Sequence, residues 1–174
     1  MALNKQELYD NNELIPYKNK ILNALAKSTM LYELVLNTPC DNVELMEGLR
    51  WVNYIPHLYV DGTIKETEAY VMFDIDQRTS PVDAYNTYNI YFQIICHKSI
   101  AHIASVGATR CDCIISELCH LFKDKMLNAD NGLGLGKNLK THDRVINPPN
   151  NNFIARELAF SVTDFDERLK KRHG

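Results

Sequence analysis

Residues 87–97 read Thr87-Tyr88-Asn89-Ile90-Tyr91-Phe92-Gln93-Ile94-Ile95-Cys96-His97. Side chains of different character alternate along this stretch, so successive residues point to opposite faces of a predicted β-strand. Its aromatic and β-branched content supports the same assignment. A second alternating stretch, Glu68–Asp76, precedes it. Together they predict a β-ribbon whose two strands are joined by an extended loop, and this ribbon decides the fold.

Helical periodicity flanks the ribbon on both sides. From Pro16 to Leu36, apolar residues recur at three- and four-residue spacing, and Ser28-Thr29 predicts a break into two helices. Pro39 ends this region because the residue before a proline avoids helical angles. After the ribbon, an amphipathic helix is predicted over Gly107–Leu127, and we expect it to lie across the apolar face of the sheet.

Two further strands are predicted at Leu139–Ile146 and Ile154–Thr163, and Trp51–Val60 is predicted to be extended. The element order is helix, strand, strand, helix, strand, strand. Strands grouped in pairs favour antiparallel hairpins, so the sequence predicts an α+β fold, a mostly antiparallel β-sheet flanked by helices. We expect a flexible arm at residues 1–13, a single domain at 14–165 and a charged tail at 166–174.

Size and composition exclude several classes of protein. A chain of 174 residues fits one domain, and its formal net charge of −3 lacks the basic surplus of a protein that grips DNA by its phosphates. No apolar run is long enough to predict a transmembrane helix, and the polar start of the chain predicts no secretory signal. Five cysteines, an odd number, favour reduced thiols in a cytoplasmic setting.

Cysteine and histidine cluster on the predicted helix, at Cys111, Cys113, Cys119 and His120. Residues two apart on a helix point in nearly opposite directions, so Cys111 and Cys113 cannot both face one metal ion. Structural zinc sites also use a different spacing. Packing of Cys111 and Cys119 in the core is therefore favoured over zinc binding.

The glycine-rich stretch from Asn131 to Lys137 is similar to a phosphate-binding loop. The motif requires glycine where Asn131 stands and serine or threonine where Asn138 stands. The stretch also follows a helix, whereas a phosphate loop follows a strand. A mobile connector is favoured over nucleotide binding.

Three carboxylates, Asp74, Asp76 and Asp83, are candidates for holding a divalent cation. They support an alternative function as a small metal-dependent hydrolase or nuclease, although a solvated polar strand face is favoured. A third hypothesis is a cytoplasmic binding module with a ligand groove. No residue is assigned to catalysis, to a cofactor or to a metal, and we predict that the chain is not an enzyme.

The strand texture of Lys65–Asp76, Thr87–His97 and Ile154–Phe165, with the order of elements around it, resembles the tail-terminator proteins of long-tailed bacteriophages. Related tail-completion and neck proteins share this pattern. The resemblance runs from about Leu14 to Phe165. It implies a small α+β virion subunit that forms a ring, usually a hexamer, without enzyme activity or cofactor. The ring caps the tail tube and joins it to the head-side connector.

The resemblance also implies partners and a location. The chain is expected to contact copies of itself, the tail tube protein and the neck or connector protein, and to have no membrane partner. DNA passes through the lumen of the ring without specific binding. The expected location is the tail or neck of the virion, reached from the host cytoplasm during assembly.

Individual residues can be assigned to this ring as hypotheses. Asp74, Asp76 and Lys137 are candidates for the lumen, where exposed carboxylates would repel DNA phosphates. Ring closure requires one patch to meet a different patch on the neighbouring subunit. Tyr91 and Ile95, on the opposite side of the strand from Phe92, are candidates for that interface. Alternatively, both sheet faces are covered within one subunit.

Overall fold

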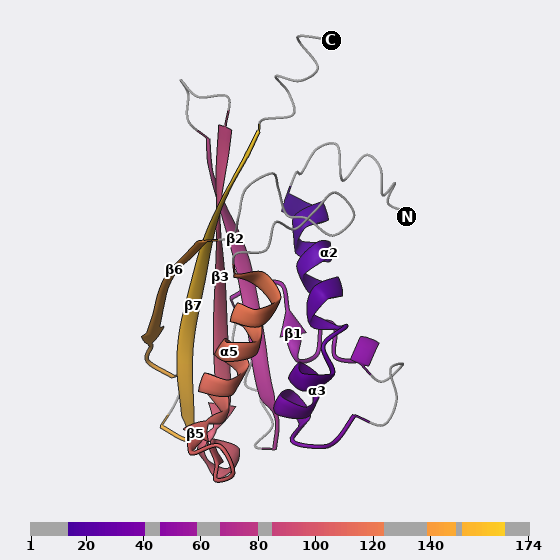
Figure 1. Cartoon of the computed structure of the whole chain (residues 1–174), viewed down its shortest axis with the longest axis vertical. Coiled ribbons are helices and arrows are strands. Elements are labelled where there is room, and N and C mark those ends of the chain that lie inside the picture. Colours follow the sequence, from indigo (N-terminus) through magenta and orange to yellow (C-terminus); the bar gives the residue numbers. More distant parts are fainter. Residues whose placement is uncertain are drawn as a thin grey trace.

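The computed structural model of the chain describes residues 14–40, 46–58, 67–79, 85–123, 139–148 and 151–165. Within these ranges, a five-stranded sheet carries its helices on one face (Figure 1). The helices are α2 (Leu14–Leu25), α3 (Thr29–Leu36) and α5 (Arg110–Phe122), and a short 3-10 helix, η1, spans Lys98–Ile100. The strands of the sheet are β1 (Tyr54–Ile55), β2 (Ala69–Thr79), β3 (Tyr85–His97), β6 (Leu139–Val145) and β7 (Phe153–Phe165). A separate two-stranded ladder pairs β4 (His102–Ile103) with β5 (Ala108–Thr109).

The strand order is β1-β2-β3-β7-β6. Every neighbouring pair is antiparallel except β1 and β2, which run parallel. The predicted α+β class with a mostly antiparallel sheet is therefore confirmed. The predicted β-ribbon is also present, because β2 and β3 form a continuous antiparallel ladder in which Phe73 lies opposite Phe92.

Alternation along the strands divides the sheet into two faces. Phe73, Phe92 and Leu158 form one cross-strand row that faces the helices, while the next row, Asp74, Tyr91 and Ala159, faces the other way. We call the side of the sheet opposite the helices the outer face. Because the helices bury only one face, polar residues are concentrated on the outer one.

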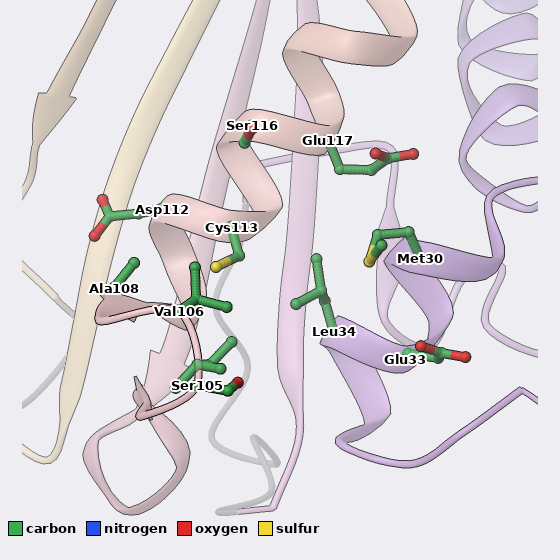
Figure 2. A pocket seen from close by; sticks show the side chains of 11 residues that line it. Met30, Glu33, Leu34, Ser105, Val106, Ala108, Asp112, Cys113, Ser116 and Glu117 are labelled. Atoms are coloured by element: carbon green, nitrogen blue, oxygen red, sulfur yellow. The ribbon is translucent and has the colours of Figure 1, made fainter.

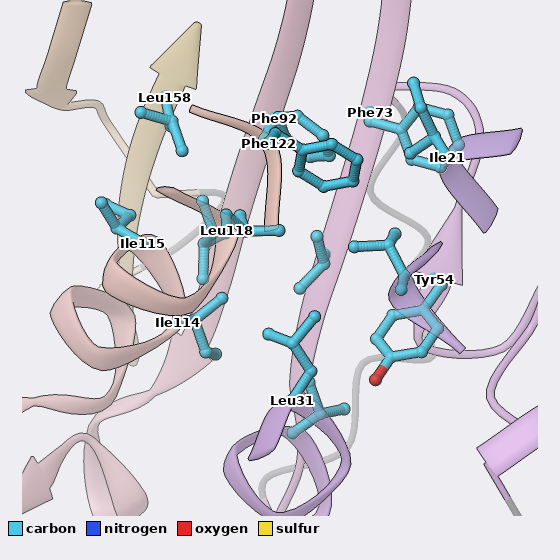
Figure 3. Close-up of a cluster of buried hydrophobic side chains, with 14 of the residues drawn as sticks. Ile21, Leu31, Tyr54, Phe73, Phe92, Ile114, Ile115, Leu118, Phe122 and Leu158 are labelled. Carbon is cyan, nitrogen blue, oxygen red and sulfur yellow. The ribbon is translucent and has the colours of Figure 1, made fainter. Parts of the chain in front are cut away.

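The main core lies between the sheet and the helices (Figure 3). Phe92 is at its centre and is fully buried. The centroid of its ring lies 5.9 Å from that of Phe73, 5.4 Å from that of Phe122 and 6.1 Å from that of Phe160. Such spacings favour ring–ring contact, so α5 is held on the sheet by aromatic packing.

The predicted break between two N-terminal helices is confirmed at Ser28. This residue has an extended backbone, and its hydroxyl accepts a hydrogen bond from the backbone N–H of Leu31 at 3.1 Å, which caps α3. The same hydroxyl donates to Glu117 of α5 at 2.8 Å. At the other end, Asn37 adopts a left-handed conformation and ends the helix. Ser28 therefore both starts α3 and ties it to α5.

The predicted helix Gly107–Leu127 begins three residues later than expected, at Arg110. Gly107 has a φ of +68°, which a helix does not accept, and it is followed by β5. Thr109 then caps α5 by a capping box with Asp112. The residues of this region that follow Lys123 lie outside the described residues, as do the predicted arm at 1–13, the glycine-rich stretch and the tail at 166–174.

The predicted extended segment Trp51–Val60 is largely a turn in its described part. Trp51 has a φ of 65°, and its N–H donates to the carbonyl oxygen of Tyr54 at 2.9 Å. Only β1 is extended, and it adds to the edge of β2. No helix in the described part of the chain has the length and apolar content needed to span a membrane.

Candidate functional site

The outer face brings together two of the predicted lumen residues. Asp74 and Asp76 both lie on it, with side chains 42% and 52% exposed. Each of the two carboxylates has a cationic side chain beside it. Asp74 lies 2.7 Å from the ammonium of Lys18, which reaches over from α2, and Asp76 lies 3.5 Å from the guanidinium of Arg78. The expected repulsive wall is therefore partly neutralised. Lys137 and Asp83 lie outside the described residues.

The two predicted interface residues, Tyr91 and Ile95, differ in exposure. Tyr91 is half-buried opposite Asp74, and its ring lies 6.4 Å from the ring of His142. Ile95 is only 2% exposed, because it packs with Met72 and Phe153 in a second apolar cluster. Ile95 therefore lies on the outer face as predicted, but it is covered within the subunit and offers no exposed contact there.

A charged network that the sequence reasoning missed lies further along the outer face. The buried carboxylate of Glu157 accepts hydrogen bonds from Nε2 of His142 and from Nε of Arg144, both at 2.9 Å. Burial raises the pKa of Glu157, but hydrogen bonds from His142, Arg144 and Gln93 outweigh it and leave the pKa below its ordinary value. The register of β6 against β7 creates this cluster, and no local pattern in the sequence indicates it.

A second ionic cluster joins β6, β7 and α5 on the helix-bearing side of the sheet. The guanidinium of Arg156 donates to Asp112 of α5 and to Asp143 of β6. Burial raises the pKa of Asp143, but hydrogen bonds from Arg156 and Lys140 lower it below its ordinary value. Charges on the described part of the sheet are thus largely paired within the subunit.

Acidification is expected to weaken the fold through Glu157 and Asp143. Their folded pKa values are lowered, so the stability they contribute is complete above their unfolded values, about 4.3 and 3.9, and is lost as the pH falls through the folded values. The free energy of unfolding in urea should fall more steeply below about pH 4 for the native chain than for Glu157→Gln. Equal slopes for the two proteins would contradict the assignment to Glu157.

The metal candidates that the structure describes form no metal site, and Asp83, the third aspartate candidate, lies outside the described residues. Among the described residues, no group of three or more histidine, cysteine, aspartate and glutamate side chains could hold a metal ion. Cys111 is fully buried and Cys119 packs against the core, as expected. A hydrogen bond with Cys96, together with burial, raises the pKa of the Cys111 thiol. Cys111 is therefore held as a neutral thiol inside the core.

A groove runs between α3 and α5 and has a volume of about 670 Å³ (Figure 2). Its apolar lining includes Met30, Leu34 and Val106, and two of these side chains are well exposed, Met30 at 53% and Val106 at 65%. Glu33 and Glu117 also line it. In Figure 2, Glu117 projects from α5 toward Met30 on α3. The groove is thus apolar in the middle with carboxylates beside it.

The buried cation Arg110 holds this groove in shape. Its guanidinium donates to the carbonyl oxygens of Ile100 at 2.9 Å and Leu34 at 2.8 Å, and to Oδ1 of Asn37 at 2.6 Å. It thereby ties the end of α3 to the start of α5. A positive charge is favourable beside the C-terminus of a helix. The sequence reasoning did not single out Arg110. Its acceptors at the end of α3 lie about 70 residues away in the sequence, and two of its three acceptors are backbone carbonyl oxygens, which no residue type in the sequence indicates.

One known protein family matches the chain over most of its length. The family model YomW matches residues 13–162. The chain belongs to the YomW family. The match runs from the start of α2 into β7, so the YomW region contains the outer face, the groove and Arg110.

The chain has less similarity to curated proteins and to solved structures than to this family. No curated protein matches the chain. Among solved structures, one similar chain comes from a structure described as "Virion of native gene transfer agent (GTA) particle". It is 12% identical with a TM-score of 0.44, and the alignment covers 82% of this chain and 98% of that chain.

Proposed function

We propose that this YomW-family chain is a structural protein of a phage virion, and that it forms a ring that caps the tail tube and joins it to the head-side connector. Membership of a phage-derived family supports a virion role. The strand texture that resembles tail-terminator and neck proteins supports the finer assignment, and it covers nearly the same residues as the YomW match.

The shape of the sheet is the observation that carries this proposal. β3 and β7 each have 13 residues, so each is about 43 Å long at the usual rise of a strand. α5 also has 13 residues but is only about 20 Å long. It therefore covers about half of the strands, on one face (Figure 1). Beyond α5 the same face is covered by α2, where the ring of Tyr17 lies 4.8 Å from that of Tyr88 and both Tyr88 and Val162 are buried. The long outer face, which carries no helix, therefore provides the surface that a subunit between two partners requires.

Trp51 supports self-association. This residue, the one tryptophan of the sequence, is 66% exposed and sits in a left-handed conformation that bulky side chains rarely adopt. Val52 beside it is also exposed. Exposed tryptophan is enriched among residues that dominate binding energy at protein interfaces. We assign Trp51 and Val52, together with Tyr91, to contacts between neighbouring subunits.

The lumen hypothesis is retained in a modified form. We assign the part of the outer face that carries Asp74 and Asp76 to the lumen, where each carboxylate is accompanied by a cation, Lys18 or Arg78. A wall of balanced charge neither binds phosphates tightly nor repels them strongly, so DNA can slide past it. Lys137 remains a predicted lumen residue. The tail tube and connector proteins are the proposed neighbours along the axis.

Light scattering combined with fluorescence of Trp51 tests this function. The purified chain, alone or mixed with the tail tube protein of its phage, should reach a mass several times its 20.0 kDa. The emission of Trp51 should shift to shorter wavelength as assemblies form, and Trp51→Ala should weaken assembly. A mass of one chain under both conditions, with unshifted emission, would contradict the proposal.

Replacing Asp74 by asparagine should have a small structural effect. The pair with Lys18 is partly exposed, so we expect a loss of about 0.5–1 kcal/mol in the free energy of unfolding, with assembly retained. Lys18→Met should cost a similar amount, and the double variant little more than either. Magnesium-dependent hydrolysis of nucleic acid by the native chain that Asp74→Asn abolishes would instead support the hydrolase alternative.

A further inference from the structure

The groove between α3 and α5 has the chemistry of a site for a cationic, partly apolar peptide. Its lining includes three carboxylates, Glu33, Asp112 and Glu117, and no lysine or arginine of the described residues. Between them lie exposed apolar side chains, such as Met30 and Val106. Any peptide that fills the groove must therefore bring positive charge to its edges and an apolar group to its centre.

Two of these carboxylates have no ion-pair partner among the described residues. Glu117 accepts a hydrogen bond from the Ser28 hydroxyl at 2.8 Å, and Glu33 accepts one from the backbone N–H of Cys40 at 3.3 Å. Asp112 differs, because Arg156 already neutralises it. The described carboxylates of the sheet, by contrast, mostly lie beside a cationic side chain. Glu33 on α3 and Glu117 on α5 are therefore negative charges still available to an occupant.

We infer that the occupant is the C-terminal tail of a second copy of this chain. The tail contains the run Arg168-Leu169-Lys170-Lys171-Arg172, which has four cationic side chains around one leucine. The other end of the chain does not fit, because residues 1–13 contain one lysine against three acidic residues. Charge complementarity therefore selects the C-terminal tail.

The length of the tail determines which copy supplies it. β7 ends at Phe165, at the opposite end of the molecule from β5 (Figure 1). The β4–β5 hairpin lines one end of the groove with Ile103, Val106 and Ala108. The seven residues that follow Phe165, up to Arg172, the last cation of the run, span about 25 Å at full extension. This is shorter than the roughly 40 Å length of β7 itself. The cationic run of the same chain therefore falls short of the hairpin end of the groove, whereas the tail of a neighbour can fill the groove along its whole length.

Such a contact joins two different patches, a tail and a groove, and is heterologous. Repeated from subunit to subunit, it closes into a ring if the rotation between neighbours allows closure. The inference rests on the proposed ring and adds to it the pair of surfaces that hold neighbours together. Arg110 supports the contact indirectly, because it fixes α3 against α5 and so sets the width of the groove.

Charge exchange tests the contact. Reversing the four tail cations to glutamate should lower the association constant at least about tenfold, as should Glu33→Lys combined with Glu117→Lys. Each chain alone should assemble poorly, whereas a chain with both sets of reversals should recover much of the lost association. The control is Lys98→Glu, an exposed reversal outside the groove, which should leave association unchanged.

Cross-linking tests the position of the tail directly. Cys113 lines the groove and is partly exposed. A chain with Leu169→Cys should form a covalent dimer under mild oxidation, and adding Cys113→Ser should abolish it. When a tail-deleted chain is mixed with an equal amount of the Leu169→Cys chain, the tail-deleted copy should be captured through its Cys113.

The outcomes separate this inference from the proposed function. If assemblies form but ignore tail deletion and charge reversal, the inference is overturned and the ring stands. If cross-linking joins Cys113 only to the cysteine of the same chain, the inference is likewise overturned. If no assembly forms under any condition, the ring is overturned and the inference with it.

Discussion

Replacing Phe92 by alanine is expected to lower the free energy of unfolding by about 3–5 kcal/mol. Phe92 is fully buried and its ring contacts those of Phe73, Phe122 and Phe160, so truncation leaves a cavity where the sheet meets α5 (Figure 3). Aromatic contacts add to the loss of buried area. Urea unfolding followed by circular dichroism measures the change.

The neighbouring residue provides a matched control for Phe92. Tyr91 belongs to the same strand but points to the outer face, where it is half-buried, so Tyr91→Ala should cost about 1 kcal/mol or less. If Phe92→Ala does not fold, the milder Phe92→Leu should fold with a smaller loss. Equal losses for the alanine variants of Tyr91 and Phe92 would show that the two faces have been assigned wrongly.

Replacing Arg110 by methionine is expected to cost about 3–4 kcal/mol, although methionine retains much of the apolar stem. The change leaves three acceptors without their donor, namely the carbonyl oxygens of Ile100 and Leu34 and Oδ1 of Asn37. Buried acceptors that lose a partner keep their full desolvation cost. Thermal and urea unfolding measure the loss.

Arg110→Lys separates charge from geometry. Lysine keeps the positive charge but cannot reproduce the planar fork that reaches three acceptors, so we expect an intermediate loss. The exposed Lys98→Met should have almost no effect. A loss below about 1 kcal/mol for Arg110→Met would show that α3 and α5 do not depend on this cation.

The faces of the central strands could be predicted well from the sequence because alternation reports burial directly. Phe92 and Tyr91 were assigned to opposite faces, and Ser28 was placed at the break between helices, because each assignment depends on local residues alone. The fold class followed from the order of these elements. Such features are encoded within a few neighbouring positions.

The features that were missed depend on residues far apart in the chain. The burial of Ile95 depends on Phe153, which is more than 50 residues away, and the network at Glu157 depends on the register of β6. The parallel pairing of β1, two residues long, leaves too short a pattern to detect. The left-handed Trp51 was missed because its conformation is set by the turn that closes on Tyr54.

The candidate site was predicted less completely than the fold. Asp74 and Asp76 lie on one face as expected, but the cations beside them come from α2 and from within β2. The groove requires α3, α5 and the β4–β5 hairpin to meet, and this meeting depends on Arg110. A pattern of neighbouring residues in the sequence cannot predict that these three elements contact one another.

Electron microscopy of the purified chain mixed with tail tubes tests the central claim most directly. The account predicts closed rings of several copies, seated at one end of the tubes, with the tail of each copy in the groove of the next. Tubes with bare ends, beside protein that remains as single 20.0 kDa chains, would contradict it.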